Sequence, residues 1–246
     1  MMSDKFKAQK AIVTGGTRGL GGAITALLLQ HGATVVAVYG SNDQAAAAFK
    51  TAWNDFPVET VKLDVADYHA VEKFFADYDS RYESLDILVN SAGIRRDAVL
   101  GMMTFEDWNA VISTNLTGSF NMCKFAVHRM MQRRYGRIIN ITSPSGKIGF
   151  AGQSNYAASK AGQVALAQSL SKEVARRGIT VNCVSPGFID TELLADLSED
   201  LRKEYKNQVP MKRFGTPGEV AATVDFLASK EASYVNGAVF EVTGGL

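Results

Sequence analysis

A tyrosine and a lysine four residues apart form the side-chain pair best suited to proton transfer in this sequence. Tyr156 and Lys160 lie in the stretch 154–177, which we predict to be a helix, so that they share one helical face. A phenol has a pKa of about 10, and a nearby ammonium lowers it by stabilising the phenolate. The pair is suited to acid–base chemistry on a carbonyl or an alcohol. The same spacing is also common in exposed surface pairs, so other residues must support this interpretation.

Further polar residues stand next to or inside predicted elements. Ser143 follows the predicted strand 137–142, where its hydroxyl could donate to a substrate oxygen, and Ser145 is an adjacent alternative. Asn115 lies in the predicted helical stretch 104–133, and asparagine is unfavourable inside a helix unless its amide is used. Asn115 is therefore either a satisfied polar residue of that helix or a member of the same site.

A glycine-rich segment, residues 14–21, lies between the first predicted strand and the first predicted helix. Gly15 permits the positive φ of a sharp turn, Gly19 lets a pyrophosphate approach the backbone, and Gly21 lets the helix pack closely on the sheet. The free N–H groups at the helix start favour an anion. The spacing differs from the common G-x-G-x-x-G fingerprint, and a purely structural turn is the alternative. Three further residues of this segment, Thr17, Arg18 and Leu20, would line the same site.

The end of the second predicted strand favours NADP(H) over NAD(H). Between residues 34 and 42 the sequence has no acidic residue to bind a ribose 2′-hydroxyl. Arg18 could instead pair with a 2′-phosphate, with Ser41 and Asn42 as hydrogen-bond donors. A solvated arginine without a ligand is the alternative.

Predicted strands and helices alternate along the whole chain. The strands are 11–14, 34–39, 58–63, 85–90, 137–142, 180–184 and 239–242, and the helices are 20–31, 43–54, 68–81, 104–133, 154–177, 199–206 and 219–229. The strands are apolar rather than alternating, which is typical of burial on both faces. We therefore predict an α/β fold: a single doubly wound, Rossmann-type domain over residues 1–246, with about seven parallel strands and helices on both faces. A (β/α)8 barrel would need eight regular units.

Composition excludes several classes of protein. The 246 residues include 26 Lys+Arg and 25 Asp+Glu, so no overall charge attracts nucleic acid or anionic lipid. No apolar stretch is long enough to span a bilayer, and no secretory signal is visible. Two cysteines are too few for a disulfide framework or a zinc site. We expect a cytoplasmic protein without a metal, a nucleic-acid partner or a membrane contact.

Over residues 10–246 the sequence resembles the short-chain dehydrogenase/reductase family. The resemblance rests on the order and approximate spacing of residues 14–21, Asp64-Val65, Asn90-Ser91-Ala92-Gly93, Asn115, Ser143, Tyr156-x-x-x-Lys160 and Pro186-Gly187. Within the family the chain is most similar to the 3-oxoacyl-(acyl-carrier-protein) reductases, in residues 138–160, 177–191 and 215–232. This implies NADPH-dependent reduction of a 3-oxoacyl thioester to the 3-hydroxyacyl thioester, in fatty-acid or polyketide-type synthesis. Alternatives are reduction of another ketone (a CoA thioester, sugar or steroid) and a non-catalytic dinucleotide sensor.

The resemblance also implies roles for individual residues. Tyr156 would protonate the carbonyl oxygen and Ser143 would orient it. Lys160 would lower the tyrosine pKa and bind the nicotinamide ribose, and Asn115 would hold a water that links Lys160 to a proton relay. The cofactor would further contact Asp64 and Val65 at the adenine, Asn90, Ser91, Ala92 and Gly93 near the ribose, and Pro186, Gly187, Ile189 and Thr191 at the nicotinamide. Ser91 departs from the family, which commonly has a second asparagine there.

Two surface features concern the substrate and partners. We predict that residues of about 190–215 form a mobile flap over the active site. Its residues Leu193, Leu194 and Leu197 either line an acyl channel or only anchor the flap. Arg134 and Arg177 follow long predicted helices, and the resemblance implies that they contact an acidic carrier protein. The alternative is that they are favourable cations at helix C-termini. By resemblance alone, we expect a homotetramer.

Overall fold

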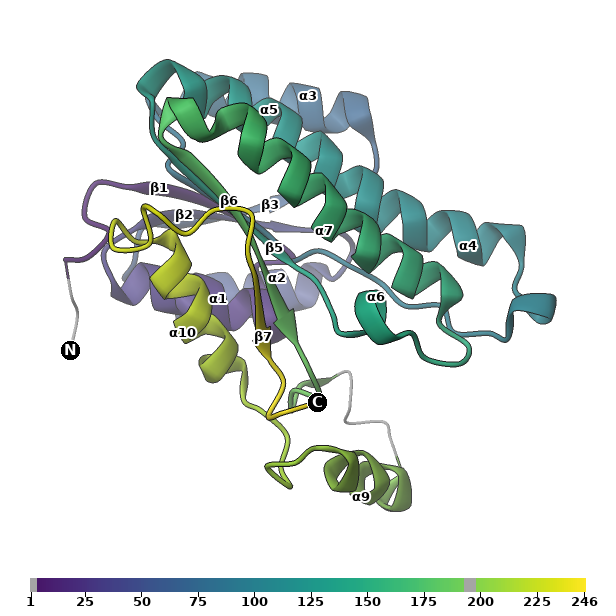
Figure 1. Cartoon of the computed structure of the whole chain (residues 1–246). Coiled ribbons are helices and arrows are strands. Elements are labelled where there is room, and N and C mark those ends of the chain that lie inside the picture. The colour runs from purple at the N-terminus through teal and green to yellow at the C-terminus, as the bar shows by residue number, and fades with distance from the viewer. Residues whose placement is uncertain (1–3, 193–197) are drawn as a thin grey trace.

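The computed structural model describes residues 4–192 and 198–246, and its centre is a seven-stranded parallel sheet (Figure 1). The strands are β1 (Lys10–Thr14), β2 (Thr34–Tyr39), β3 (Val58–Lys62), β4 (Ile87–Asn90), β5 (Gly136–Ile141), β6 (Ile179–Pro186) and β7 (Val239–Val242). They lie in the order β3-β2-β1-β4-β5-β6-β7, and each neighbouring pair is parallel. The predicted doubly wound sheet is confirmed.

Helices form a layer on each face of the sheet (Figure 1). One layer contains α1 (Gly19–Gln30), α2 (Asp43–Ala52) and α10 (Pro217–Ala228), and the other contains α3 (Tyr68–Asp79), α5 (Gly118–Arg133) and α7 (Ser154–Val174). Three further helices, α4 (Phe105–Val111), α6 (Ser145–Ile148) and α9 (Glu199–Gln208), lie towards one end of the sheet. The sequence predicted the long helices within a few residues of these bounds, but not α6 or the 3₁₀ turn Leu100–Met102. Among the described residues we find no helix with the length and apolar character of a membrane span.

Alternate residues of the central strands contribute to two separate apolar cores. In β1, Ile12 packs into the core beneath α3, α5 and α7, whereas Val13 packs into the core beneath α1 and α10. The edge strands differ from our expectation that all strands are buried on both faces. None of β3 is fully buried, and β7 alternates between exposed and half-buried residues. An edge strand has a neighbour on one side only, and Glu59, Lys62 and Glu241 on these strands remain in contact with solvent.

The predicted helical stretch 104–133 is interrupted by a π-helical turn. Residues Ile112–Thr117 form this turn between α4 and α5. Such turns change the backbone hydrogen-bond pattern locally and are frequent at functional sites. Here the carbonyl oxygen of Asn115 accepts hydrogen bonds from the side chains of Ser119 (2.7 Å) and Gln163 (3.0 Å). The turn therefore directs a backbone acceptor towards α7.

The loops that follow β1 to β6 all emerge at one edge of the sheet, because the strands are parallel. We call it the carboxyl edge. β1 lies between β2 and β4, so that the chain crosses from one half of the sheet to the other at this point. In doubly wound folds a ligand binds outside the carboxyl ends of the strands at this crossing.

The hydroxyl of Thr14 connects the glycine loop after β1 to the loop after β4 by hydrogen bonds. It is 1% exposed, and its Oγ1 accepts hydrogen bonds from the backbone N–H groups of Ser91 and Ala92, both at 3.0 Å. A Cβ atom at Gly15 would lie 3.2 Å from the Ala92 backbone, so the loops are in close contact. The glycine loop thus has a fixed position relative to the loop after β4.

Substitution of Thr14 tests this connection. Thr14→Val removes the acceptor of two N–H groups while keeping the side-chain shape, and we expect the free energy of unfolding to fall by about 2 kcal/mol. Thr14→Ser keeps the hydroxyl and loses only a methyl group, so its loss should be clearly smaller. Denaturant unfolding of both variants measures the difference. An equal or larger loss in Thr14→Ser would assign the effect to packing instead.

Candidate active site

The predicted serine, tyrosine and lysine meet at the carboxyl edge. Ser143 lies two residues beyond β5, and Tyr156 and Lys160 occupy the first turns of α7. The Ser143 hydroxyl lies close enough to the Tyr156 phenol to lower its pKa, and Lys160 Nζ lies 5.5 Å from the centroid of the tyrosine ring. Two hydroxyls and one cation thus stand close enough to act on one bound carbonyl group.

Ser145, the alternative to Ser143, has a supporting position. Its hydroxyl donates to Gln153 Oε1 at 2.9 Å, and its backbone N–H donates to Ser143 Oγ at 3.2 Å. The side chain is 3% exposed. The geometry therefore favours Ser143 as the serine that faces Tyr156.

Asn115 joins the π-helical turn to the loop after β4. Its Oδ1 accepts from the Ile94 N–H at 2.8 Å, and its Nδ2 donates to the Ile94 carbonyl and to Ser159 Oγ, both at 3.1 Å. Ser159 donates in turn to the Tyr156 carbonyl at 2.7 Å. The amide is thus fully used, which explains an asparagine inside a helical stretch, and it links the loop to the start of α7.

The ammonium group of Lys160 is held in the protein interior. It is 4% exposed, and it donates to the Ile141 carbonyl oxygen at 2.8 Å and to Gln163 Oε1 at 2.9 Å. Burial disfavours the charged form and lowers the pKa of Lys160 to about 8. Lys160 therefore changes its charge within a pH unit or so of neutrality.

The sequence predicts a lowered pKa for Tyr156, but in the structure this pKa is raised, and Lys160 is not among the groups that shift it. Burial of the phenol raises the pKa of Tyr156 above its usual value, while the Arg95 guanidinium and the Ser143 hydroxyl act in the lowering direction. Arg95 lies 5.9 Å from the centroid of the tyrosine ring and forms an ion pair with Asp97. Sequence reasoning missed Arg95, whose only signal was a cation two residues after Gly93.

The glycine loop fits a dinucleotide pyrophosphate. Gly15 and Gly19 have φ of +64° and +53°, and a Cβ atom at Gly19 would meet nothing within 4 Å. The loop therefore leaves space at Gly19 for a bound group in front of the α1 N-terminus, and no described side chain caps this helix start. Thr17 is buried in the same loop and Leu20 is partly buried in the first turn of α1.

Gly21 has a different role from the one expected. A Cβ atom there would collide with the Gly15 carbonyl oxygen, so Gly21 permits packing of α1 on the loop rather than on the sheet. Gly16 is the residue that permits close packing on the sheet, because its Cβ would lie 3.1 Å from Ala37 Cα in β2. Sequence reasoning did not assign a role to Gly16.

The residues expected at the adenine end follow β1, β2 and β3. Arg18 Nη1 lies 3.4 Å from Glu192 Oε2, and both side chains are exposed. Asn42 caps α2 by accepting from the Ala45 N–H at 2.9 Å, which leaves its amide N–H groups free to donate, and Ser41 is exposed beside it. Asp64 Oδ1 accepts from the Ala66 N–H at 2.9 Å, and Val65 is buried against Gly118.

The loop after β4 lies beside the candidate catalytic groups. A Cβ atom at Gly93 would lie 3.3 Å from Asn115 Oδ1 and 3.6 Å from Lys160 Nζ. Ser91 and Ala92 contribute the backbone N–H groups that Thr14 accepts. The Asn90 side chain is buried and bonded to β5 and α5: its Nδ2 donates to Asn140 Oδ1 at 2.9 Å and to Cys123 Sγ at 3.2 Å.

The loop after β6 forms another side of the site. Pro186 ends β6, the Gly187 N–H donates to the Val242 carbonyl at 3.0 Å, and Ile189 pairs with Gly215. Thr191 donates weakly to the Ile189 carbonyl at 3.5 Å. Helix α9 covers this loop, since the rings of Tyr205 and Phe188 stack with centroids 4.7 Å apart. The flap residues Leu193, Leu194 and Leu197 lie outside the described residues.

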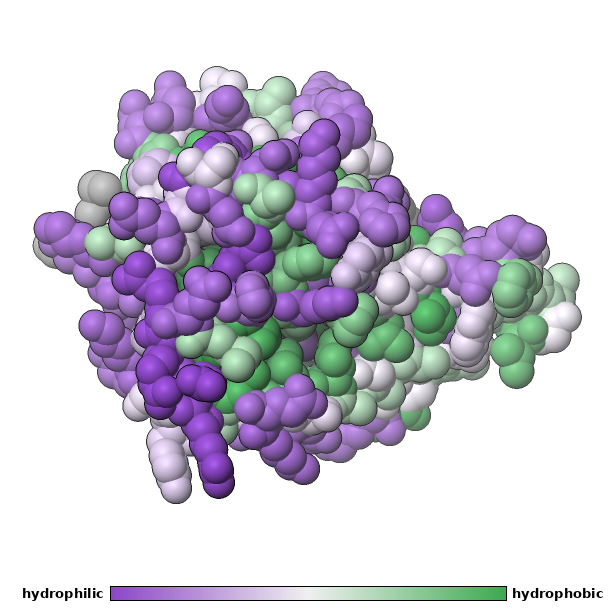
Figure 2. Space-filling view, turned by 90° about the horizontal axis from the view of Figure 1, so that it is seen from above, coloured by the Kyte–Doolittle hydropathy of each residue, from purple (hydrophilic) through white to green (hydrophobic). Residues whose placement is uncertain are grey.

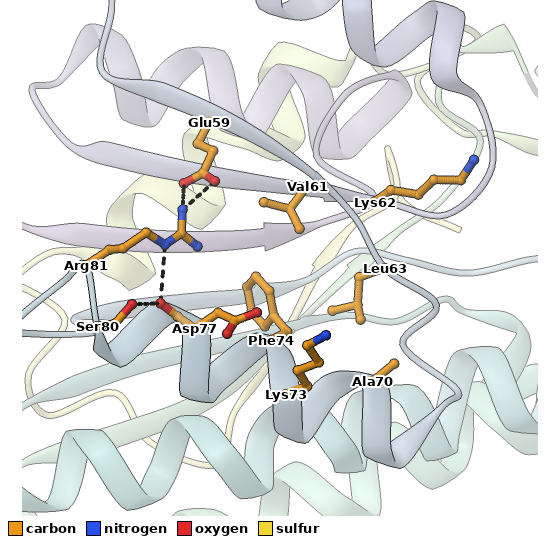
Figure 3. A pocket seen from close by; sticks show the side chains of 10 residues that line it. All are labelled: Glu59, Val61, Lys62, Leu63, Ala70, Lys73, Phe74, Asp77, Ser80 and Arg81. Carbon is orange, nitrogen blue, oxygen red and sulfur yellow. Dashed lines mark hydrogen bonds and ion pairs between the residues drawn. The ribbon is translucent and has the colours of Figure 1, made fainter.

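Of two hollows in the described part of the chain, one is lined by a candidate catalytic residue and the other is not. One of about 540 Å³ lies between α7 and β7 and is lined by Ser143, Lys147, Gln168 and Glu241, among others. The other, of about 600 Å³, lies between β3 and α3 (Figure 3). There Arg81 pairs with Glu59, and none of the candidate catalytic residues lines it. The second hollow therefore has no part in this site.

The arginines expected to contact a carrier protein lie together, but at the opposite edge of the sheet. Arg134 Nη2 donates to the Arg176 carbonyl at 3.0 Å, so the segments that directly follow α5 and α7 are in contact. Arg134 precedes β5 and Arg177 precedes β6, whereas Ser143 follows β5. At about 3.3 Å per residue, the length of β5 separates Ser143 from these two arginines by roughly 20 Å.

Comparison with known proteins gives consistent matches over nearly the whole chain. The family model described as Enoyl-(Acyl carrier protein) reductase matches residues 15–246. The 3-oxoacyl-(acyl-carrier-protein) reductase FabG of Aquifex aeolicus is 40% identical over 100% of both chains, and that of Vibrio harveyi is 44% identical over 96% of both. The acetoacetyl-CoA reductase of Shinella zoogloeoides is 43% identical over 96% of this chain and 97% of its own.

The charges around Tyr156 predict opposite effects of two neighbouring substitutions. Arg95→Gln removes a cation that favours the phenolate, so the pKa of Tyr156 should rise. Asp97→Asn removes an anion that disfavours the phenolate, so this pKa should fall. Titration of ¹³C-labelled tyrosine by NMR measures both. If neither variant moves the Tyr156 resonance, the phenol does not sense this ion pair.

Proposed function

Because the chain belongs to the short-chain dehydrogenase/reductase family, we propose that it reduces a 3-oxoacyl thioester, carried on acyl carrier protein, with NADPH. Members of the family are oxidoreductases that use a nicotinamide dinucleotide. The observation that carries the proposal is the contact between Ser143 and Tyr156, with Lys160 beside them and the glycine loop on the same edge. A dinucleotide sensor would need the loop but not this set of acid–base groups.

In the proposed reaction the protein supplies a proton and orients the carbonyl group. The bound dinucleotide supplies the hydride. Tyr156 donates its proton to the carbonyl oxygen, and because its pKa is raised, the phenol is protonated at neutral pH as this step requires. The Ser143 hydroxyl donates to the same oxygen and stabilises the charge that develops there. Lys160 would bind the nicotinamide ribose next to Gly93, and it is mostly charged at neutral pH.

The charges at the end of β2 support NADPH rather than NADH. The nearest acidic side chain after this strand is Asp43, and its carboxylate is paired with Lys62 at 2.8 Å. The hydrogen bond to Lys62 lowers the pKa of Asp43, so this group is already used as an ion-pair partner. Arg18, Ser41 and Asn42 are the exposed groups that would receive a 2′-phosphate.

The carrier of the acyl group has two candidates. The relatives named as acyl-carrier-protein reductases favour the protein-bound thioester, and the relative named as an acetoacetyl-CoA reductase favours the CoA thioester. We propose Arg134 and Arg177 as the contact with an acidic carrier protein. Since they lie at the edge opposite Ser143, we propose that the acyl group is delivered to the site of a second subunit.

A homotetramer would provide such a second subunit, and the exposed apolar surface supports it. Phe105, Phe120 and Met131 on α4 and α5 are exposed by 72%, 44% and 37%. Figure 2 views this helical side and shows apolar side chains gathered along it and at the tip near α4. Apolar surface of this kind is typical of interfaces between subunits. The cytoplasmic location stays a prediction from the sequence.

Tyr156→Phe tests the proposed reaction. Loss of the proton donor should lower kcat for acetoacetyl-carrier protein and acetoacetyl-CoA by about 100- to 10,000-fold, while NADPH binds with unchanged affinity. NADPH oxidation and fluorescence titration measure the two quantities. A wild-type protein that turns over a cyclic ketone but neither thioester would contradict the substrate assignment, and a preference for NADH would contradict the role of Arg18.

Charge reversal tests the carrier contact. Arg134→Glu combined with Arg177→Glu should raise KM for acetoacetyl-carrier protein by about tenfold and leave KM for acetoacetyl-CoA unchanged, because only the protein carrier reaches this face. Lys50→Glu combined with Lys73→Glu, the same charge change at exposed sites on α2 and α3, serves as the control. Equal losses on both substrates would assign these arginines to the helix ends.

A further inference from the structure

A buried glutamine fills the space between Lys160 and the π-helical turn. Gln163 is 0% exposed and lies three residues after Lys160 on α7. Its Oε1 accepts from Lys160 Nζ at 2.9 Å, and its Nε2 donates to the Asn115 carbonyl at 3.0 Å and to Ser119 Oγ at 2.6 Å. The acceptor and the donors of this amide are therefore all directed into one polar cluster.

The Asn115 carbonyl oxygen is fully occupied within this cluster. It accepts from Gln163 Nε2 at 3.0 Å and from Ser119 Oγ at 2.7 Å, and a carbonyl oxygen has two lone pairs. The resemblance implied a water between Asn115 and Lys160. Here the Gln163 amide spans from the Asn115 carbonyl oxygen to Lys160 Nζ by direct hydrogen bonds.

The Lys160 ammonium has three N–H donors, and two of them have fixed acceptors. Ile141 and Gln163 provide these acceptors from two different elements, β5 and α7. Within the described residues the third donor has no acceptor, so it remains for a group bound next to Gly93, where a Cβ atom would lie 3.6 Å from Nζ. A lysine side chain is long and flexible, so two fixed acceptors reduce the conformational freedom that it would otherwise lose on binding.

We propose that Gln163 is a positioning residue, which holds the Lys160 ammonium in place and in its charged form for the reaction. The inference rests on the role of Lys160 in the proposed function, and Gln163 itself acts through Lys160. The titratable groups that face Nζ in the described part of the chain are the Tyr156 phenol on α7 and the Cys183 thiol on β6. Burial raises the pKa of both, to about 12 for Cys183, so both are neutral near pH 7. The carbonyl oxygens of Ile141 and Gln163 therefore stabilise the ammonium.

Two substitutions of Gln163 should move the pKa of Lys160 in opposite directions. Gln163→Met keeps the side-chain length and removes the acceptor, so this pKa should fall from about 8 by about one unit. Gln163→Glu places an anion beside the ammonium, so the pKa of Lys160 should rise by about one unit or more. NMR titration of ¹³C-labelled lysine in the protein without dinucleotide measures the pKa directly, with Lys160→Met to assign the resonance. The alkaline limb of kcat/KM for reduction should shift in the same direction as this pKa.

The control substitutions lie on a neighbouring helix. Gln132→Met and Gln132→Glu change an exposed glutamine of α5 and should leave the Lys160 pKa unchanged. A Lys160 pKa that is equal in wild type and Gln163→Met, or that moves in the same direction in both Gln163 variants, would overturn the inference. If Gln163→Glu does not fold, the Met variant decides alone. Absence of thioester reduction by the wild type would refute the proposed function, while the NMR titration would still test the hold of Gln163 on Lys160.

Discussion

The Lys160 ammonium is a charge inside the protein, and its burial constrains the structure around it. An ion removed from water without partners costs several kcal/mol, so the interior must present acceptors at fixed positions. One acceptor is the carbonyl at the end of β5, and another is Gln163 on α7. Gln163 depends in turn on the carbonyl of Asn115, which the π-helical turn directs towards it. A displaced strand end, helix or turn would leave this charge without a partner.

The same parallel topology that assembles the candidate active site also separates it from Arg134 and Arg177. Loops after parallel strands share one edge, whereas the helices that return the chain end at the other edge. Ser143 and Arg134 are therefore at opposite ends of β5. The candidate catalytic groups are partly withdrawn from water, whereas the carrier-protein contact that we propose lies where arginines are exposed. The hydrogen bond from the Arg134 side chain to the Arg176 carbonyl, just after α7, holds the two arginine segments together.

Residue patterns predicted the sheet, the long helices and the positions of Ser143, Tyr156 and Lys160, because each follows from local periodicity and from which strand a residue follows. They did not predict the π-helical turn, in which Asn115 contacts the loop after β4, because such a long-range contact is not visible in the sequence. They also missed Arg95 and Gln163. Both lie near residues that the patterns did find, but their function depends on the side chains that the fold brings to them. The error about the pKa of Tyr156 has the same origin, because burial outweighs the nearby charges and is a property of the tertiary structure.

The pKa shifts of Tyr156 and Lys160 have a joint consequence for the proposed reaction. With the phenol pKa raised, the protein at neutral pH already holds the proton that reduction of a ketone requires. The reverse reaction needs the phenolate, and each unit between the pH and this pKa adds about 1.4 kcal/mol to its barrier. Lys160, with a pKa of about 8, loses its charge first as the pH rises. The charge that would hold the ribose therefore disappears before the phenol becomes a base, so burial of both groups favours reduction at neutral pH over oxidation at alkaline pH.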